Sequence, residues 1–116
     1  MSAKKNGSPW FARSRRRMLV DMHIPDWDPA FLSRYDPAAA AAAYRRADLD
    51  AVMFYCQSHV GLCYWPTETG TPHAGMGGRD FVGEMLAELR RLPLPAVAYY
   101  SVVFNNRAFL DHPEWR

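Results

Sequence analysis

The stretch Asp36-Pro37 to Cys56, DPAAAAAAYRRADLDAVMFYC, decides the fold. Asp36 followed by Pro37 is a strong helix start signal, because Asp accepts hydrogen bonds from the first free N–H groups and proline fits the first helical position. Six alanines follow, and alanine is the best helix former. An apolar run of strand length comes after a short polar break. The stretch therefore predicts a helix near 37–47 that leads into a buried strand near 51–56.

The alternation of strand and helix continues on both sides of this stretch. An apolar run that Pro25 ends predicts a strand near 18–23. Asp80 precedes apolar residues at helical spacing, which predicts a helix near 80–91, and the strong β propensity of 96–103 predicts a third strand. The order β-α-β-α-β implies the α/β fold class with parallel strands and right-handed crossovers. Both helices then lie on one face of the sheet, although parallel strands are normally buried on both faces.

The length of the chain limits what this fold can be. The chain has 116 residues, whereas a closed (β/α)8 barrel, or TIM barrel, needs roughly 250. We therefore expect residues 18–116 to be a partial TIM barrel of three βα units, truncated at the C-terminus, after a basic flexible leader over residues 1–17. The uncovered sheet face would permit self-association. The rival interpretation is a small complete α/β domain whose open face is covered by the leader or by a partner chain.

Composition and charge disfavour several kinds of partner. Residues 1–17 hold six of the fourteen Lys and Arg residues and none of the twelve acids, so the positive charge belongs to the leader and predicts no nucleic-acid binding by the folded body. No stretch approaches the roughly 20 apolar residues of a membrane span. Cys56 and Cys63 are the only cysteines, which gives no disulfide framework and favours reduced thiols in a cytoplasmic protein.

Polar and aromatic side chains gather after the predicted strands, where parallel α/β proteins carry their active groups. Aromatic faces cover the C–H surface of a sugar, and His and Asn side chains hydrogen-bond its hydroxyls. We therefore expect a carbohydrate substrate at one rim, with His59 on a sugar hydroxyl and Tyr64 or Trp65 stacked on a ring. The candidate substrate-binding residues are His23, His59, Tyr64, Trp65, His73, Tyr100 and Asn105.

Asp21 and His23 share one strand face and offer a second interpretation, a metal-dependent hydrolase of the amidohydrolase type. His59 and His73 would complete its ligand set. A hydrogen-bonded Asp–His pair is the simpler interpretation, so we expect no metal and no other cofactor. A non-catalytic sugar-binding fragment is the third alternative. The acids near the strand ends form no clear pair for glycoside hydrolysis, so the catalytic residues stay unassigned.

Three stretches carry a resemblance to a known family. They are Val20 to Pro25, then Ser58 to Thr67 with His73, then Ala98 to Asn105 with His112 to Trp115. Together they resemble the N-terminal part of the hypothetical glycosyl hydrolase 6 family and, more distantly, the alpha-L-fucosidases of glycoside hydrolase family 29. In those fucosidases a His-His-Asp-Gly segment follows the second strand and binds the sugar. Here Ser58-His59-Val60-Gly61 keeps one His and the Gly, and lacks the first His and the Asp.

The resemblance implies a hydrolase barrel of carbohydrate metabolism with fucosidase-like or galactosidase-like activity. It also implies that the nucleophile and the acid/base residue belong to later strands than those of this chain. The function expected from the sequence is therefore a glycoside hydrolase-like fragment that lacks the catalytic carboxylates and has no glycosidase activity by itself.

Overall fold

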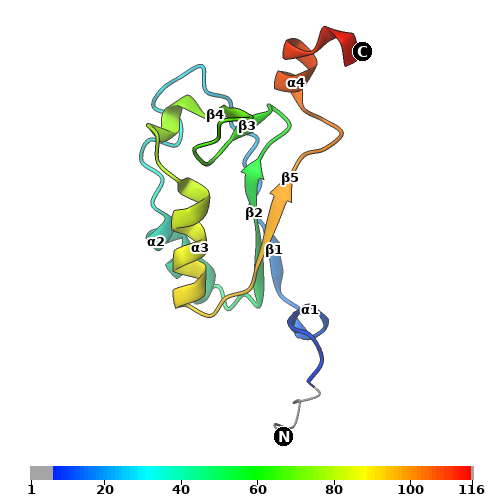
Figure 1. The fold of residues 1–116 in the computed structure, drawn as a ribbon. Coiled ribbons are helices and arrows are strands. Elements are labelled where there is room, and N and C mark those ends of the chain that lie inside the picture. Colours follow the sequence, from blue (N-terminus) through cyan, green and yellow to red (C-terminus); the bar gives the residue numbers. More distant parts are fainter. Residues whose placement is uncertain (1–6, 116) are drawn as a thin grey trace, which may run out of the picture.

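The computed structural model describes residues 7–115, so residues 1–6 of the expected leader lie outside the described part. Its centre is a parallel sheet of β1 (Arg17–Leu19), β2 (Ala51–Gln57) and β5 (Ala96–Tyr100), with β2 in the middle. The crossovers run through α2 (Pro37–Arg46) and α3 (Phe81–Arg91), which pack side by side on one side of the sheet (Figure 1). The prediction of an α/β fold with parallel strands is confirmed.

Both crossover helices begin where the sequence signals place them. The Asp36 carboxylate accepts hydrogen bonds from the N–H groups of Ala38 and Ala39, at 2.9 and 3.1 Å, and Asp80 caps α3 through the N–H of Gly83. In α2 the small side chain of Ala41 is fully buried. The buried side chains of α3 recur at helical spacing and meet those of β2, and this core includes Val52, Phe54, Phe81, Met85 and Leu89. The sheet and the two helices therefore form one hydrophobic core.

Two strands are shorter than the sequence predicts, because side chains replace strand partners. The first strand ends at Leu19 instead of residue 23, and beyond it the Tyr64 hydroxyl bonds the backbone of Met22 and Ile24. The third strand ends at Tyr100 instead of residue 103. The next N–H group, that of Ser101, donates to the side-chain oxygen of Gln57 at 3.0 Å. Both strands therefore stop pairing before the residue at which the sequence predicts their end.

Short elements that the sequence did not predict cover this end of the sheet (Figure 1). Residues 57–78, between the predicted second strand and second helix, contain β3 (Leu62–Cys63), β4 (Thr71–Pro72) and a 3-10 helix η1 (Ala74–Met76). β3 pairs antiparallel with the end of β2 and parallel with β4. After β5 the chain forms α4 (Asn106–Asp111) and η2 (Pro113–Trp115), beyond the last element that the sequence predicts. These elements surround the place where the candidate residues lie.

The described part of the leader is attached to the amino ends of the strands. It contains α1 (Trp10–Arg13), and the N–H groups of Arg15 and Arg16 both donate to the Asp50 carboxylate at 2.9 Å. These bonds lower the pKa of Asp50. Trp10 and Phe11 line a cavity of about 350 Å³ with residues of β1, β2 and β5. Across residues 7–115 no helix has the length and apolar character needed to cross a membrane.

Candidate functional site

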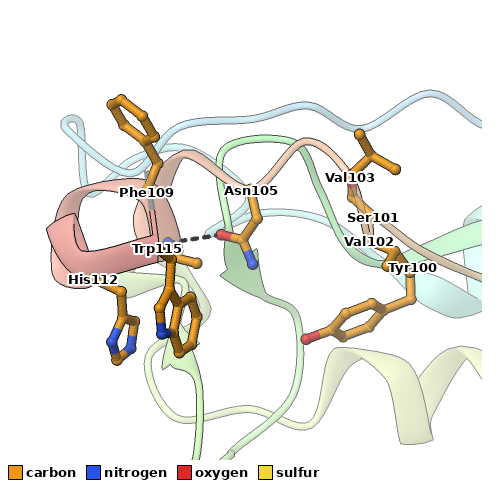
Figure 2. A pocket seen from close by; sticks show the side chains of 9 residues that line it. Tyr100, Ser101, Val102, Val103, Asn105, Phe109, His112 and Trp115 are labelled. Carbon is orange, nitrogen blue, oxygen red and sulfur yellow. Dashed lines mark hydrogen bonds between the residues drawn. The ribbon is translucent and has the colours of Figure 1, made fainter.

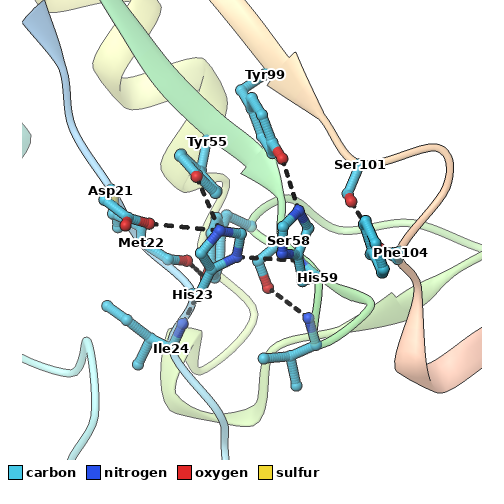
Figure 3. A network of polar contacts seen from close by, with 12 residues as sticks. Asp21, Met22, His23, Ile24, Tyr55, Ser58, His59, Tyr99, Ser101 and Phe104 are labelled. Atoms are coloured by element: carbon cyan, nitrogen blue, oxygen red, sulfur yellow. Dashed lines mark hydrogen bonds and ion pairs between the residues drawn. The ribbon is translucent and has the colours of Figure 1, made fainter.

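Two histidines that follow neighbouring strands meet at the carboxyl end of the sheet (Figure 3). His23 follows β1 and His59 follows β2, and their rings stack with centroids 3.9 Å apart and planes 27° apart. The backbone N–H of His59 donates to Nδ1 of His23 at 3.1 Å. Because Nδ1 accepts, the neutral His23 ring carries its proton on Nε2. One hydrogen bond thus sets both the orientation and the tautomer of His23.

Each of these histidines also has its own tyrosine. Tyr55 on β2 and Tyr99 on β5 are register partners, and their rings stack with centroids 4.1 Å apart. The Tyr55 hydroxyl lies 3.0 Å from Nε2 of His23, and the Tyr99 hydroxyl lies 2.9 Å from Nε2 of His59. The parallel register therefore places two hydroxyls at the same height, beneath two stacked imidazoles.

The cluster places the Tyr55 hydroxyl and the His23 ring beside one exposed acid. Oδ1 of Asp21 lies 3.5 Å from Nε2 of His23, and the Asp21 side chain is 70% exposed. Burial, followed by the Asp21 carboxylate and the Tyr99 hydroxyl, raises the pKa of Tyr55. Tyr55 therefore keeps its hydroxyl proton at physiological pH. Such a set of hydrogen-bond donors and acceptors with one carboxylate suits a ligand rich in hydroxyl groups.

Tyr64 and His73, two of the predicted site residues, lie in the interior beneath this cluster. Tyr64 is fully buried, and its hydroxyl donates to the carbonyl of Met22. His73 is 1% exposed, and its Nδ1 accepts from the N–H of Gly75 while its Nε2 lies 3.0 Å from the carbonyl of Pro25. The polar atoms of both side chains are hydrogen-bonded to backbone groups. In this structure they fix the loop that carries His23.

The other predicted residues, Trp65, Tyr100 and Asn105, lie around the carboxyl end of β5. Trp65 is half-buried, and its ring lies 6.4 Å from that of Tyr100. Asn105 caps α4, because its side-chain oxygen accepts from the N–H of Ala108 at 2.9 Å. Tyr100 and Asn105 line a cavity of about 340 Å³ together with His112 and Trp115. The seven candidates thus divide into a histidine pair with His59 exposed and His23 half-buried, a buried pair, and this third group.

A metal site needs more ligands than these groups bring together. Asp21 and His23 approach each other as the amidohydrolase interpretation requires. Within residues 7–115, however, no group of three His, Cys, Asp or Glu side chains could hold a metal ion. Buried His73 bonds backbone groups, and Cys56 and Cys63 are free thiols. Burial and the neighbouring Cys63 raise the pKa of Cys56 to about 11, so its thiol stays protonated.

Sequence reasoning missed four residues of these groups. Tyr55 and Tyr99 were missed because the sequence of a buried strand does not show which of its aromatic side chains reach the site at the carboxyl end. In the Tyr99-Tyr100 pair, alternation sends the two rings to opposite faces, and the sequence does not say which face is inside. His112 and Trp115 follow the last strand, so the rule that placed the other candidates could have found them. Their stack, with centroids 3.8 Å apart, depends on the turn of η2.

No protein-family model matches the chain, and no curated protein matches its sequence. Solved structures do match its fold. Alpha-L-fucosidase isoenzyme 2 from Paenibacillus thiaminolyticus superposes with a TM-score of 0.78 at 17% identity, over 86% of this chain and 15% of that enzyme. A Thermotoga maritima alpha-L-fucosynthase in complex with alpha-L-Fuc-(1-2)-beta-L-Fuc-N3 gives 0.58 at 28% identity, over 65% and 18%. The Thermotoga maritima alpha-fucosidase gives 0.58 at 27% identity over the same shares.

The identities and coverages limit the likeness to the fold of one part of these proteins. The chain spans only 15 to 18% of the length of these solved proteins. The match therefore does not assign the activity of those whole proteins to this chain. What matches is the backbone fold of 86% of this chain in the first of these structures and of 65% in the other two. The chain therefore has a glycoside hydrolase-like fold, similar to one part of these alpha-L-fucosidases.

Proposed function

We propose that this chain forms the first three βα units of a TIM-barrel glycoside hydrolase and supplies one wall of a fucosidase-like sugar site. The observation that carries the proposal is the meeting of His23 and His59 at the carboxyl ends of parallel strands. In TIM barrels the substrate binds at this end. The likeness to alpha-L-fucosidases, one of them solved with a fucosyl ligand, supports fucose as the sugar.

In this proposal the His59 side chain forms a hydrogen bond with one sugar hydroxyl. The Asp21 carboxylate accepts a hydrogen bond from a second sugar hydroxyl. The His59 side chain is exposed, yet its stack on His23 and its bond to Tyr99 hold the ring in place. A ring that is already ordered loses little side-chain freedom when the ligand binds. The Asp21 carboxylate makes a charge-assisted hydrogen bond, which is stronger than a neutral one. The pair can therefore orient one pyranose ring.

The chain binds the sugar without hydrolysing it. Glycoside hydrolysis needs two carboxyl groups roughly 5–10 Å apart on either side of the bond. Three acids at this end of the described part already have partners: Asp26 bonds Ala74, Asp111 pairs with Arg107 and Glu114 pairs with His112. We expect no release of nitrophenol from aryl fucosides or galactosides by the 116-residue chain. Release above the rate without protein would contradict this expectation.

A titration with L-fucose, followed by NMR on the isotope-labelled chain, tests the binding site. The chemical shifts of the His23 and His59 rings should change. Those of buried His73 should stay unchanged and serve as the internal control. Tyr99→Phe removes the hydroxyl that holds His59 and should weaken binding about fivefold, the worth of one hydrogen bond.

The matched control for that variant lies on the other side of the sheet. Tyr44→Phe also removes one hydroxyl from a hydrogen-bonded pair, with Tyr35, but Tyr44 lies on α2 and its hydroxyl contacts neither histidine. It should leave the dissociation constant unchanged. Equal weakening by both variants, or no shift of His23 and His59 at saturating L-fucose, would refute the proposed site.

A further inference from the structure

The cavity beyond β5 has the chemistry of a second ligand site. We call it the aromatic groove and define it by Tyr100, Asn105, His112 and Trp115. Its volume is about 340 Å³, and its two large rings are open to solvent, with Tyr100 53% and Trp115 70% exposed. Among the described residues that line it, none is Lys, Arg, Asp or Glu. A neutral ligand with one apolar face therefore suits it better than a charged one.

The aromatic floor of the groove is held before any ligand arrives. The rings of His112 and Trp115 stack with centroids 3.8 Å apart and planes 8° apart. Nδ1 of His112 lies 2.9 Å from the Glu114 carboxylate, which fixes the imidazole in turn. In Figure 2, His112 lies on one side of the indole, and Asn105 and Tyr100 lie on the other. One face of Trp115 is thus covered by its own chain and the other faces the groove.

Asn105 supplies the groove with a hydrogen-bond donor of fixed direction. Its oxygen accepts from the N–H of Ala108, so its nitrogen is the atom left to donate. Figure 2 shows this nitrogen pointing into the space between Trp115 and Tyr100. An aromatic face beside an amide donor and a phenolic hydroxyl matches a pyranose ring, which has C–H groups on its faces and hydroxyls at its edge.

The groove shares lining residues with a second cavity, which His59 also lines. Val103, Asn105 and Phe109 line both the groove and a neighbouring cavity of about 320 Å³ that reaches His59. The N–H of Asn106 donates to the carbonyl of His59 at 2.9 Å, which ties the start of α4 to the end of β2. The two sites therefore keep a fixed spacing.

Gly61 makes this close approach possible. Its φ is +91°, and a Cβ there would lie 2.3 Å from the side-chain oxygen of Asn105 and 2.5 Å from Cβ of Arg107. The N–H of Arg107 also donates to the carbonyl of Val60, at 3.1 Å. A glycine is thus required where the loop after β2 meets the first turn of α4.

We infer that the aromatic groove is a second carbohydrate subsite, which takes the sugar ring joined to the one held at His23 and His59. The inference rests on the proposed function and narrows its substrate class from simple fucosides to oligosaccharides. The second ring lays one face on Trp115 and places its hydroxyls on the Asn105 amide and the Tyr100 hydroxyl.

Binding of two probes to the full chain tests the inference: methyl alpha-L-fucoside and the disaccharide alpha-L-Fuc-(1-2)-beta-L-Fuc-N3. The disaccharide should bind about tenfold more tightly than the monosaccharide, as one aromatic stack contributes. Trp115→Ala should abolish this preference and leave the monosaccharide constant unchanged, and Trp115→Phe should give an intermediate preference. Trp27→Ala removes another exposed indole, 74% exposed, and should preserve it.

Each outcome separates this inference from the proposed function. If the His59 signals respond but both probes bind equally, the groove is no subsite while the histidine site stands. If His59 responds to neither probe, both proposals fail. If dilution alone shifts the Trp115 indole signal, the groove is a contact between copies of the chain and the inference is overturned.

Discussion

Residues 51–57 and residues 102–115 are both rich in apolar side chains, yet their surroundings are opposite. In β2, Val52 and Phe54 are at most 1% exposed, whereas Val102 and Val103 after β5 are 84% and 86% exposed. The first set removes apolar surface from water and so supplies free energy of folding. The second set supplies almost none. Apolar groups that stay exposed and contiguous mark surfaces that contact something else, a ligand or more protein.

Phe→Ala in the core that β2 shares with α3, compared with Phe→Ala after β5, gives the largest expected contrast. Phe81→Ala removes a ring that is 1% exposed and contacts Tyr35 and Tyr64, and it should lower the free energy of unfolding by about 3–5 kcal/mol. Phe104→Ala removes a ring that is 67% exposed and should change it by less than about 0.5 kcal/mol. Urea denaturation followed by circular dichroism measures both. A large loss at Phe104 would mean that the exposed region belongs to the core.

The junction between the two regions is the next point to test. Gly61→Ala forces a Cβ into Asn105 and Arg107 at a positive φ, and it should cost about 3 kcal/mol or detach α4 from the sheet. Gly77→Ala is the matched control, because Gly77 also has a positive φ, +57°, but open space around its Cβ position. It should cost only about 1 kcal/mol. Urea denaturation gives the two values, and equal costs would show that backbone strain alone matters at Gly61.

A smaller effect is expected from the hydroxyl that ends the first strand. Tyr64→Phe leaves the carbonyl of Met22 without its donor in the core and should destabilise the chain by about 1–2 kcal/mol. Burial raises the pKa of Tyr64, so this loss should be independent of pH below the usual tyrosine range. Denaturation midpoints at pH 6 and pH 8 check this. A loss that differs between these two values would contradict the neutral hydroxyl assigned here.

The least disruptive test probes the chemistry of the thiols. Burial raises the pKa of Cys56 to about 11, so its thiolate is scarce at pH 8 and alkylation should be slow. The rate should climb as the pH approaches that value. Iodoacetamide labelling followed by peptide mass spectrometry measures it, with the urea-unfolded chain as the fast control. Labelling of Cys56 in the folded chain at the unfolded rate at pH 8 would show that this side of β2 is open.

The elements that local chemistry specifies were predictable, and the rim was not. Asp36-Pro37 and Asp80 started helices where expected, because a cap depends only on the next few residues. The candidate residues His23 and His59 followed from the rule that active groups lie after parallel strands. Tyr99 was missed in favour of its neighbour Tyr100, since only the register against β2 decides which ring meets a histidine.

The sequence by itself determined the order of the three parallel strands and the two crossover helices, and the caps of those helices, because propensity and periodicity act over short distances. The tertiary structure alone decided where the strands end, which aromatic residues are buried and which histidines meet. The Tyr64 hydroxyl forms hydrogen bonds with the backbone of Met22 and Ile24, about 40 residues away in the sequence. The side-chain oxygen of Gln57 accepts a hydrogen bond from the N–H of Ser101. Such long-range bonds depend on the packing of the whole chain, and no local pattern encodes them.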